Sequence, residues 1–149
     1  MTSDSIRRVV GVWGVFVAIG LVVLMVALAE PFQPDSFGPG HDARAYWSAP
    51  LDDPYVEGSV GQESAYLYSP AFLWLLSPLR ALSWPLFLGI WTGGLLVVLF
   101  WLARPLLFLP LVLLALPEIW GGNITILHAA AIVLGFRRPW AWAFPLLTH

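Results

Sequence analysis

The sequence contains no cysteine and very little charge. Of its 149 residues, 11% are charged and 59% are hydrophobic, whereas soluble domains have about 25% charged and 45–50% apolar residues. The lack of cysteine excludes disulfides, thiolate zinc sites and a cysteine nucleophile. The scarcity of charge, with a mean hydropathy of +0.79, excludes a soluble enzyme, a disordered protein and a nucleic-acid-binding module. The composition indicates an all-α integral membrane protein with a single domain over 1–149.

Several motifs of soluble enzymes are also missing. The sequence has no Walker loop, no dinucleotide-binding fingerprint, no His-Glu-x-x-His and no Gly-x-Ser-x-Gly. Its histidines and acids do not have the spacing of a ligand set, so no metal is implied. No cofactor is expected besides the substrates.

The longest apolar run covers 9–29 and contains no charged side chain. At 1.5 Å per residue it spans roughly 31 Å, enough for the hydrocarbon core of a bilayer. A cleaved signal peptide is the alternative, but its apolar region is usually only about 7–15 residues long. We therefore predict a retained first membrane helix. Arg7 and Arg8 precede it and place the N-terminus in the cytoplasm.

The segment 30–65 differs from the rest in composition. It carries seven of the nine acidic residues, and its only lysine or arginine is Arg44. A loop that follows an inside-to-outside helix faces the cell exterior, and a loop of this length is more often functional than idle. Short helical pieces are predicted around 42–48 and 61–66.

Further membrane helices are predicted over 66–149, giving about four to five in all. The segment 66–84 is read as an outside-to-inside crossing that ends near Arg80, and 85–103 as the next crossing. This leaves Arg104 outside, against the preference of arginine for the inner face. A short helix near the outer face then precedes a crossing over 122–136, which brings Arg137 and Arg138 inside.

The last residues form an apolar stretch that ends at His149 and is too short to cross a bilayer. A re-entrant tail is one interpretation. A fragment of a longer protein is the one we favour.

The strongest candidate for chemistry is Asp42 in the outer loop. A carboxylate near the membrane surface can accept the proton of a sugar hydroxyl, which is a poor nucleophile until a base removes that proton. Arg44 can bind a phosphate, and Tyr46 and Trp47 can stack on a sugar or anchor the loop. The alternative is that Asp42 is one solvated acid among seven.

Three other residue groups are candidates for a role at the site or in the fold. Tyr66 and Tyr68 lie before Pro70 and place phenols at the membrane surface, as an ordinary aromatic belt also does. Asn123 follows two glycines and can bind substrate or, more plausibly, cap the next helix. His128, on an apolar helix face, is expected to be a packed and hydrogen-bonded histidine.

The order of these motifs resembles the N-terminal part of glycosyltransferase family 87, also called domain of unknown function 2029, within the GT-C superfamily. The resemblance runs from about Val9 to the end. The matching segments are Asp42-x-x-x-Tyr46-Trp47, Asp53-Pro54-Tyr55, Tyr68-Ser69-Pro70-Ala71-Phe72, Ser77-Pro78-Leu79, Gly122-Asn123-Ile124, Arg137-Arg138-Pro139-Trp140 and Ala143-Phe144-Pro145-Leu146-Leu147-Thr148.

The resemblance implies a multi-pass protein of the inner (plasma) membrane, the start of a GT-C-type helical bundle. It implies transfer of a sugar, often mannose, from a polyprenyl-phosphate carrier to a lipid-linked or glycan acceptor on the outer face. Asp42 takes the place of the general base in an inverting displacement, with Arg44, Tyr46, Tyr66, Tyr68 and Asn123 as candidate substrate contacts. The alternative function is a non-catalytic small subunit or scaffold of a transporter-like complex.

Overall fold

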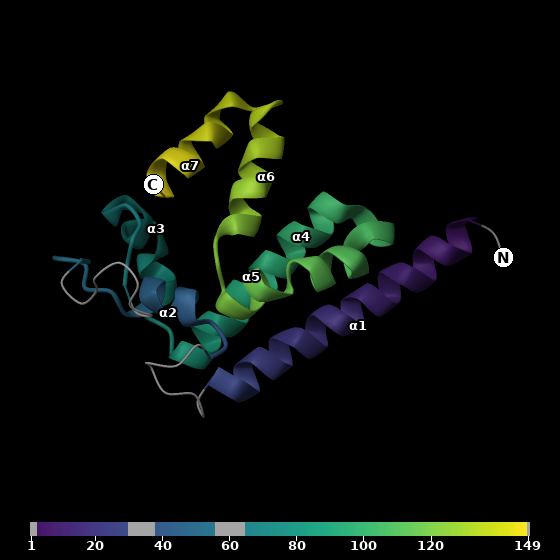
Figure 1. Cartoon of the computed structure of the whole chain (residues 1–149), viewed down its shortest axis with the longest axis horizontal. Helices are drawn as coiled ribbons and strands as arrows, with labels where there is room; N and C mark the ends of the chain where they lie inside the picture. The colour runs from purple at the N-terminus through teal and green to yellow at the C-terminus, as the bar shows by residue number, and fades with distance from the viewer. Residues whose placement is uncertain (1–2, 30–37, 56–64, 149) are drawn as a thin grey trace.

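The computed structural model describes residues 3–29, 38–55 and 65–148, and every regular element in these ranges is helical (Figure 1). The elements are α1 (Ser3–Ala29), α2 (His41–Ser48), α3 (Pro70–Arg80), α4 (Trp84–Leu114), α5 (Leu116–Gly121), α6 (Thr125–Gly135), the 3-10 turn η1 (Pro139–Trp142) and α7 (Ala143–Thr148). The predicted all-α class is confirmed. Of the described helices, α1 and α4 are long and apolar enough to cross a membrane, and the predicted number of four to five crossings is not established.

α4 is a hairpin of two helical arms, 84–103 and 105–114 (Figure 1). At the reversal Arg104 has φ 57° and ψ 165°, a conformation that costs a residue with a side chain about 1–3 kcal/mol. Pro105 explains the break, because a proline disfavours the helical conformation of the residue before it. The first arm has about 20 residues, enough to span a hydrocarbon core. The second arm folds back on it, with Phe108 against Phe100.

α1 lies antiparallel to the first arm of α4. A β-carbon added to Gly89 would lie 3.0 Å from the side chain of Val26, near the C-terminal end of α1. At the other end, a β-carbon added to Gly11 would lie 3.9 Å from Pro105. Arg104 is therefore at the same end of the molecule as the N-terminal turns of α1.

This arrangement corrects the predicted order of crossings. α3 has 11 residues and a length of about 16 Å, too short to span a bilayer. The Arg80 side chain donates hydrogen bonds to the backbone carbonyls of Trp47, at 3.0 Å, and of Ala49. The Trp47 indole donates to the carbonyl of Leu82 at 3.0 Å. Arg80 thus lies at the end of α2, and 66–84 does not form the single membrane-length helix that the sequence predicted.

α6 also has 11 residues, so the predicted crossing over 122–136 is not formed as one membrane-length helix. α6, η1 and α7 form a second hairpin, and α7 approaches α3, where Phe144 meets Phe72. His128 is within hydrogen-bonding distance, 2.7 Å, of the Thr148 hydroxyl. The prediction of a packed, hydrogen-bonded histidine is confirmed.

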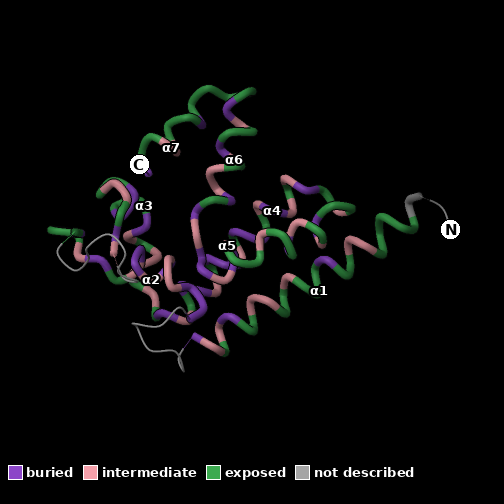
Figure 2. Tube along the Cα trace, in the orientation of Figure 1, coloured by how far each residue is buried: buried purple, intermediate pink, exposed green. Residues whose placement is uncertain are grey.

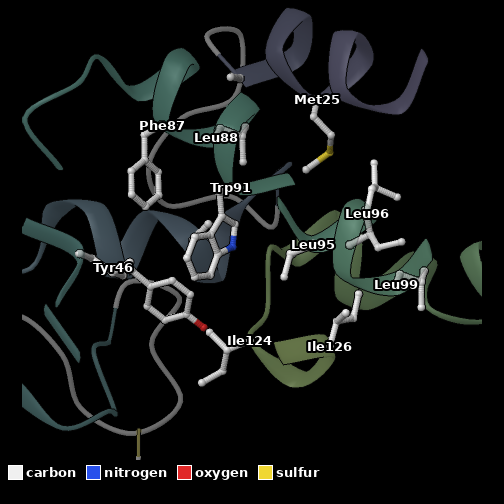
Figure 3. Close-up of a cluster of buried hydrophobic side chains, with 14 of the residues drawn as sticks. Met25, Tyr46, Phe87, Leu88, Trp91, Leu95, Leu96, Leu99, Ile124 and Ile126 are labelled. Carbon is white, nitrogen blue, oxygen red and sulfur yellow. The ribbon is translucent and has the colours of Figure 1, made fainter. Parts of the chain in front are cut away.

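Buried residues concentrate where α2, α3, the start of α4 and the α5–α6 connection meet (Figure 2). Tyr46, Trp91 and Ile124 come from three separate segments and lie together in this cluster (Figure 3). α1, by contrast, exposes most of its apolar side chains. The tightly packed junction, rather than the long helices, therefore fixes the positions of the candidate site residues.

Candidate functional site

The first turn of α2 is fixed against the rest of the core by Gly40. This residue has φ 76°, and its backbone N–H donates to the carbonyl of Trp120 at 2.7 Å. A β-carbon at this position would lie 2.4 Å from the Leu88 side chain. Since glycine alone tolerates both the backbone conformation and the contact, it lets α2 begin directly against α4. Asp42 follows in the first helical turn, with 35% of its side chain exposed.

The α5–α6 connection approaches the same turn. Gly122 has φ 72°, and a β-carbon there would lie 2.6 Å from that of Ala43. The Trp91 indole donates to the buried carbonyl of Gly122 at 2.7 Å. The connection is thus held from one side by α4 and fits closely against α2 on the other.

This fit brings Asn123 to Asp42. The Asn123 amide nitrogen donates to Asp42 Oδ2 at 3.0 Å. Its Oδ1 accepts from the backbone N–H and the hydroxyl of Thr125, at 3.0 and 2.7 Å. The oxygen is engaged by two donors, so the nitrogen must face the carboxylate. Asn123 accordingly bonds Thr125 at the start of α6, although the N-cap position itself is Ile124 and has no side-chain cap. It also orients Asp42.

His41 is the residue nearest the other carboxylate oxygen in the described ion pair. Its Nε2 is 3.7 Å from Asp42 Oδ1, and its Nδ1 is 3.3 Å from the carbonyl of Gly38. The 3.7 Å separation is longer than a hydrogen bond. Asp42 Oδ1 consequently has no short contact from His41 or Asn123 that would block an incoming hydroxyl.

Two tyrosines, Tyr46 and Tyr68, lie near Asp42. The Tyr46 hydroxyl donates to that of Tyr68 at 3.2 Å, and it points toward Ile124 in the α5–α6 connection (Figure 3). Burial raises the pKa of Tyr46, and the nearby Tyr68 and Asp42 raise it further. The ring of Tyr46 is fully buried, so it has no face on which a sugar can stack.

Tyr68 is only half-buried, whereas its partner Tyr46 is fully buried. Burial raises its pKa most, and the charges of Asp42 and Glu118 also raise it. Both phenols therefore stay neutral and can donate or accept hydrogen bonds beside the carboxylate.

Arg44 and Tyr66 lie away from the Asp42 carboxylate. Arg44 is two residues further along α2, and such pairs do not share a helix face; its guanidinium stacks 5.1 Å above the Trp84 ring. Tyr66 is buried and donates to the carbonyl of Ser69 at 2.7 Å. The structure therefore brings Asp42, Tyr46, Tyr68 and Asn123 together and leaves these two outside the group.

Three residues of the site were not singled out from the sequence. His41 adjoins Asp42, Trp91 holds the Gly122 carbonyl, and Glu118 lies half-buried at the start of α5. A signal for Glu118 was available, because an isolated acid in an apolar stretch is costly in a membrane and is often functional. No such signal marked Trp91, whose role depends on contacts between distant segments.

The described residues contain no group of three or more His, Cys, Asp or Glu side chains able to hold a metal. Comparison with protein-family models, curated proteins and solved structures finds no match to this chain.

Proposed function

We propose that this chain is a membrane glycosyltransferase of the GT-C type. It transfers a hexosyl group, for which mannose is the first candidate, from polyprenyl phosphate to a lipid-linked or glycan acceptor. The observation that carries the proposal is the hydrogen bond between Asn123 and Asp42. Each residue belongs to a segment of the family resemblance, so the contact joins two of those segments at the candidate base.

In the proposed reaction, Asp42 acts as the general base. The acceptor hydroxyl attacks the anomeric carbon of the donor while its proton passes to Asp42 Oδ1. The bond from the anomeric carbon to the phosphate oxygen breaks, and polyprenyl phosphate leaves. Asn123 holds Oδ2 and so aims Oδ1 at the acceptor, and in this proposal the Tyr68 hydroxyl bonds a sugar oxygen. A positioned base of this kind contributes about 10²–10⁴-fold to the rate.

The proposed topology follows the helix order in the structure. With the N-terminus of α1 inside, the first arm of α4 returns to the inner face and ends at Arg104. The segment 105–121 then runs back toward Asp42, because Phe108 packs against Gly14 of α1 and Gly121 packs against His41. Arg7, Arg8 and Arg104 all lie inside, as positively charged residues prefer, and the candidate site faces outward. The membrane in this proposal is the cell inner (plasma) membrane.

Donor selectivity tests the proposal. The protein, expressed from its complete gene, is reconstituted into proteoliposomes with a glycolipid acceptor and given one radiolabelled donor at a time. We expect transfer from polyprenyl-phosphate mannose or another polyprenyl-phosphate hexose, and none from a nucleotide sugar. Transfer from the nucleotide sugar alone, or from no donor of either class, would contradict the proposal.

A non-catalytic membrane subunit is the second candidate. It is favoured by the large apolar side chains that the second hairpin exposes, among them Phe136 and Leu146, 81% and 78% exposed. Such side chains face either lipid or a partner helix. If this candidate is correct, the protein shows no transfer from any donor and purifies from native membranes in a stoichiometric complex.

A further inference from the structure

An apolar pocket lies between the two longest helices, about 410 Å³ in volume. Apolar side chains and glycines line it: Val15 and Ile19 from α1, Val97 and Phe100 from the first arm of α4, and Phe108 from the second arm are among them. Its volume is within the usual range for sites that bind small molecules. No polar side chain lines it, so its occupant is a hydrocarbon.

Three arginines lie beyond one end of this pocket. Arg7 and Arg8 precede Val15 by about two turns, and because residues seven apart share a helix face, they extend the same rows that line the pocket. Arg104 follows Phe100 by about one turn and lies at the hairpin reversal. All three are exposed. The packing of Pro105 near Gly11 brings the two helix ends together.

The three arginines outnumber the acids near this end, where the sequence places Asp4 within one turn of Arg7 and Arg8. Among the described residues, the ion pair that the structure shows joins His41 and Asp42, at the opposite end of the molecule. Arginine binds phosphate through two parallel N–H groups, and its long side chain reaches from apolar surroundings to the membrane surface. The backbone at Arg104 also departs from helical geometry where its side chain is exposed.

We propose that the α1–α4 pocket and the three arginines form a binding site for one anionic glycerophospholipid. An acyl chain fills the pocket, and the headgroup phosphate lies among Arg7, Arg8 and Arg104. The lipid comes from the leaflet that faces the N-terminus of α1. This site is separate from Asp42 and does not depend on the proposed glycosyl transfer.

The charge requirement is tested with nanodiscs that contain equal amounts of phosphatidylglycerol and phosphatidylcholine. The protein is extracted gently, and the bound lipids are counted by native mass spectrometry. We expect one retained phosphatidylglycerol, enriched at least fivefold over phosphatidylcholine. The triple variant Arg7→Gln, Arg8→Gln, Arg104→Gly should lose this enrichment. Glycine at 104 keeps the backbone conformation accessible. The matched control, Arg137→Gln with Arg138→Gln, removes two exposed arginines elsewhere and should retain it.

The apolar part is tested by filling the pocket. Val97→Trp and Ile19→Trp each enlarge a side chain that lines it and is more than half exposed, so either variant should fold. We expect both to lose the retained lipid of either headgroup. Ile90→Trp, at an exposed position on α4 outside the pocket, should keep it.

Three results would overturn the proposal. The first is equal retention of the two phospholipids by the unmodified protein. The second is equal loss in the test and control variants, since this indicates a general annulus of lipid. The third is displacement of phosphatidylglycerol by an equimolar amount of polyprenyl phosphate, since this assigns the pocket to the glycosyl carrier.

Discussion

The Asn123 amide donates a hydrogen bond of 3.0 Å to the Asp42 carboxylate, across 81 residues of sequence. Thr125 holds the amide oxygen, so the donor faces one carboxylate oxygen. The other oxygen lies 3.7 Å from His41 Nε2, on a side chain that is 35% exposed. Asp42 is therefore an oriented carboxylate, and it is less exposed than the loop acids Asp52 and Asp53.

The first prediction concerns Gly122, which lets the α5–α6 connection approach α2. Gly122→Ala forces an alanine into a left-handed conformation, at about 1–2 kcal/mol, and places its β-carbon 2.6 Å from that of Ala43. We expect a lower thermal unfolding temperature in detergent, followed by tryptophan fluorescence.

The matched control is Gly94→Ala on α4, where a β-carbon would meet nothing within 4 Å. An alanine in a helix is more stable than glycine by about 0.5–1 kcal/mol, so this variant should be unchanged or slightly stabilised. If the two variants had the same thermal unfolding temperature, Gly122 would not pack against Ala43 as described.

The second prediction concerns Arg80, which bonds the carbonyls of Trp47 and Ala49 at the end of α2. Arg80→Met keeps the apolar stem and removes the donors. The free energy of unfolding should fall by about 1–3 kcal/mol, the range for hydrogen bonds to charged groups and for unpaired carbonyls.

Arg138→Met provides the comparison, because Arg138 is exposed and such changes usually stay within about 0.5 kcal/mol. The two variants also test the corrected fold. If Arg80 were at the inner end of a crossing helix, its loss would not affect α2, and both variants would unfold alike.

The third prediction is a loss of stability at alkaline pH. Burial raises the pKa of Tyr46 and of Tyr68 above the ordinary value of 10.0. The folded protein therefore holds both phenols neutral, whereas the unfolded chain ionises them above about pH 10. The stabilising effect is fully present below that pH and is lost as the pH rises through the folded-state pKa values.

Tyr46→Phe should reduce the slope of stability against pH above about pH 10, measured by chemical unfolding at fixed pH values. Tyr55→Phe, which alters a phenol that is 51% exposed, is the control. A slope that is unchanged in Tyr46→Phe and reduced in Tyr55→Phe would show that Tyr46 is not the buried group responsible.

Local features of the fold could be predicted from the sequence. The apolar run over 9–29 lies within α1, and the predicted helical piece at 42–48 matches α2. The break predicted over 117–123 is helical as far as Gly121, in α5. Most of the predicted piece at 61–66, and the acids Glu30, Asp35, Glu57 and Glu63, lie outside the described residues. These successes rest on helix length and on proline and glycine positions, which act locally.

The reversals of the chain could not be predicted in the same way. The segment 66–84 contains many apolar residues, but Ser69 with Pro70 and Ser83 with Pro85 begin separate helices. Where these helices go depends on contacts such as Arg80 with the end of α2. For the same reason the pairing of Asp42 with Asn123 was not predicted, since it requires the hairpin at Arg104 to return the chain to α2.

The central claim is that Asp42 is the base for sugar transfer from a polyprenyl-phosphate donor. Its most direct test is the initial transfer rate of Asp42→Asn in proteoliposomes, beside Asp52→Asn in the same loop. Asparagine keeps the size of the side chain and cannot accept the proton. The account predicts that Asp42→Asn lowers the rate at least about 100-fold, while Asp52→Asn stays within about twofold of the unmodified protein. Transfer by Asp42→Asn at the unmodified rate would contradict it.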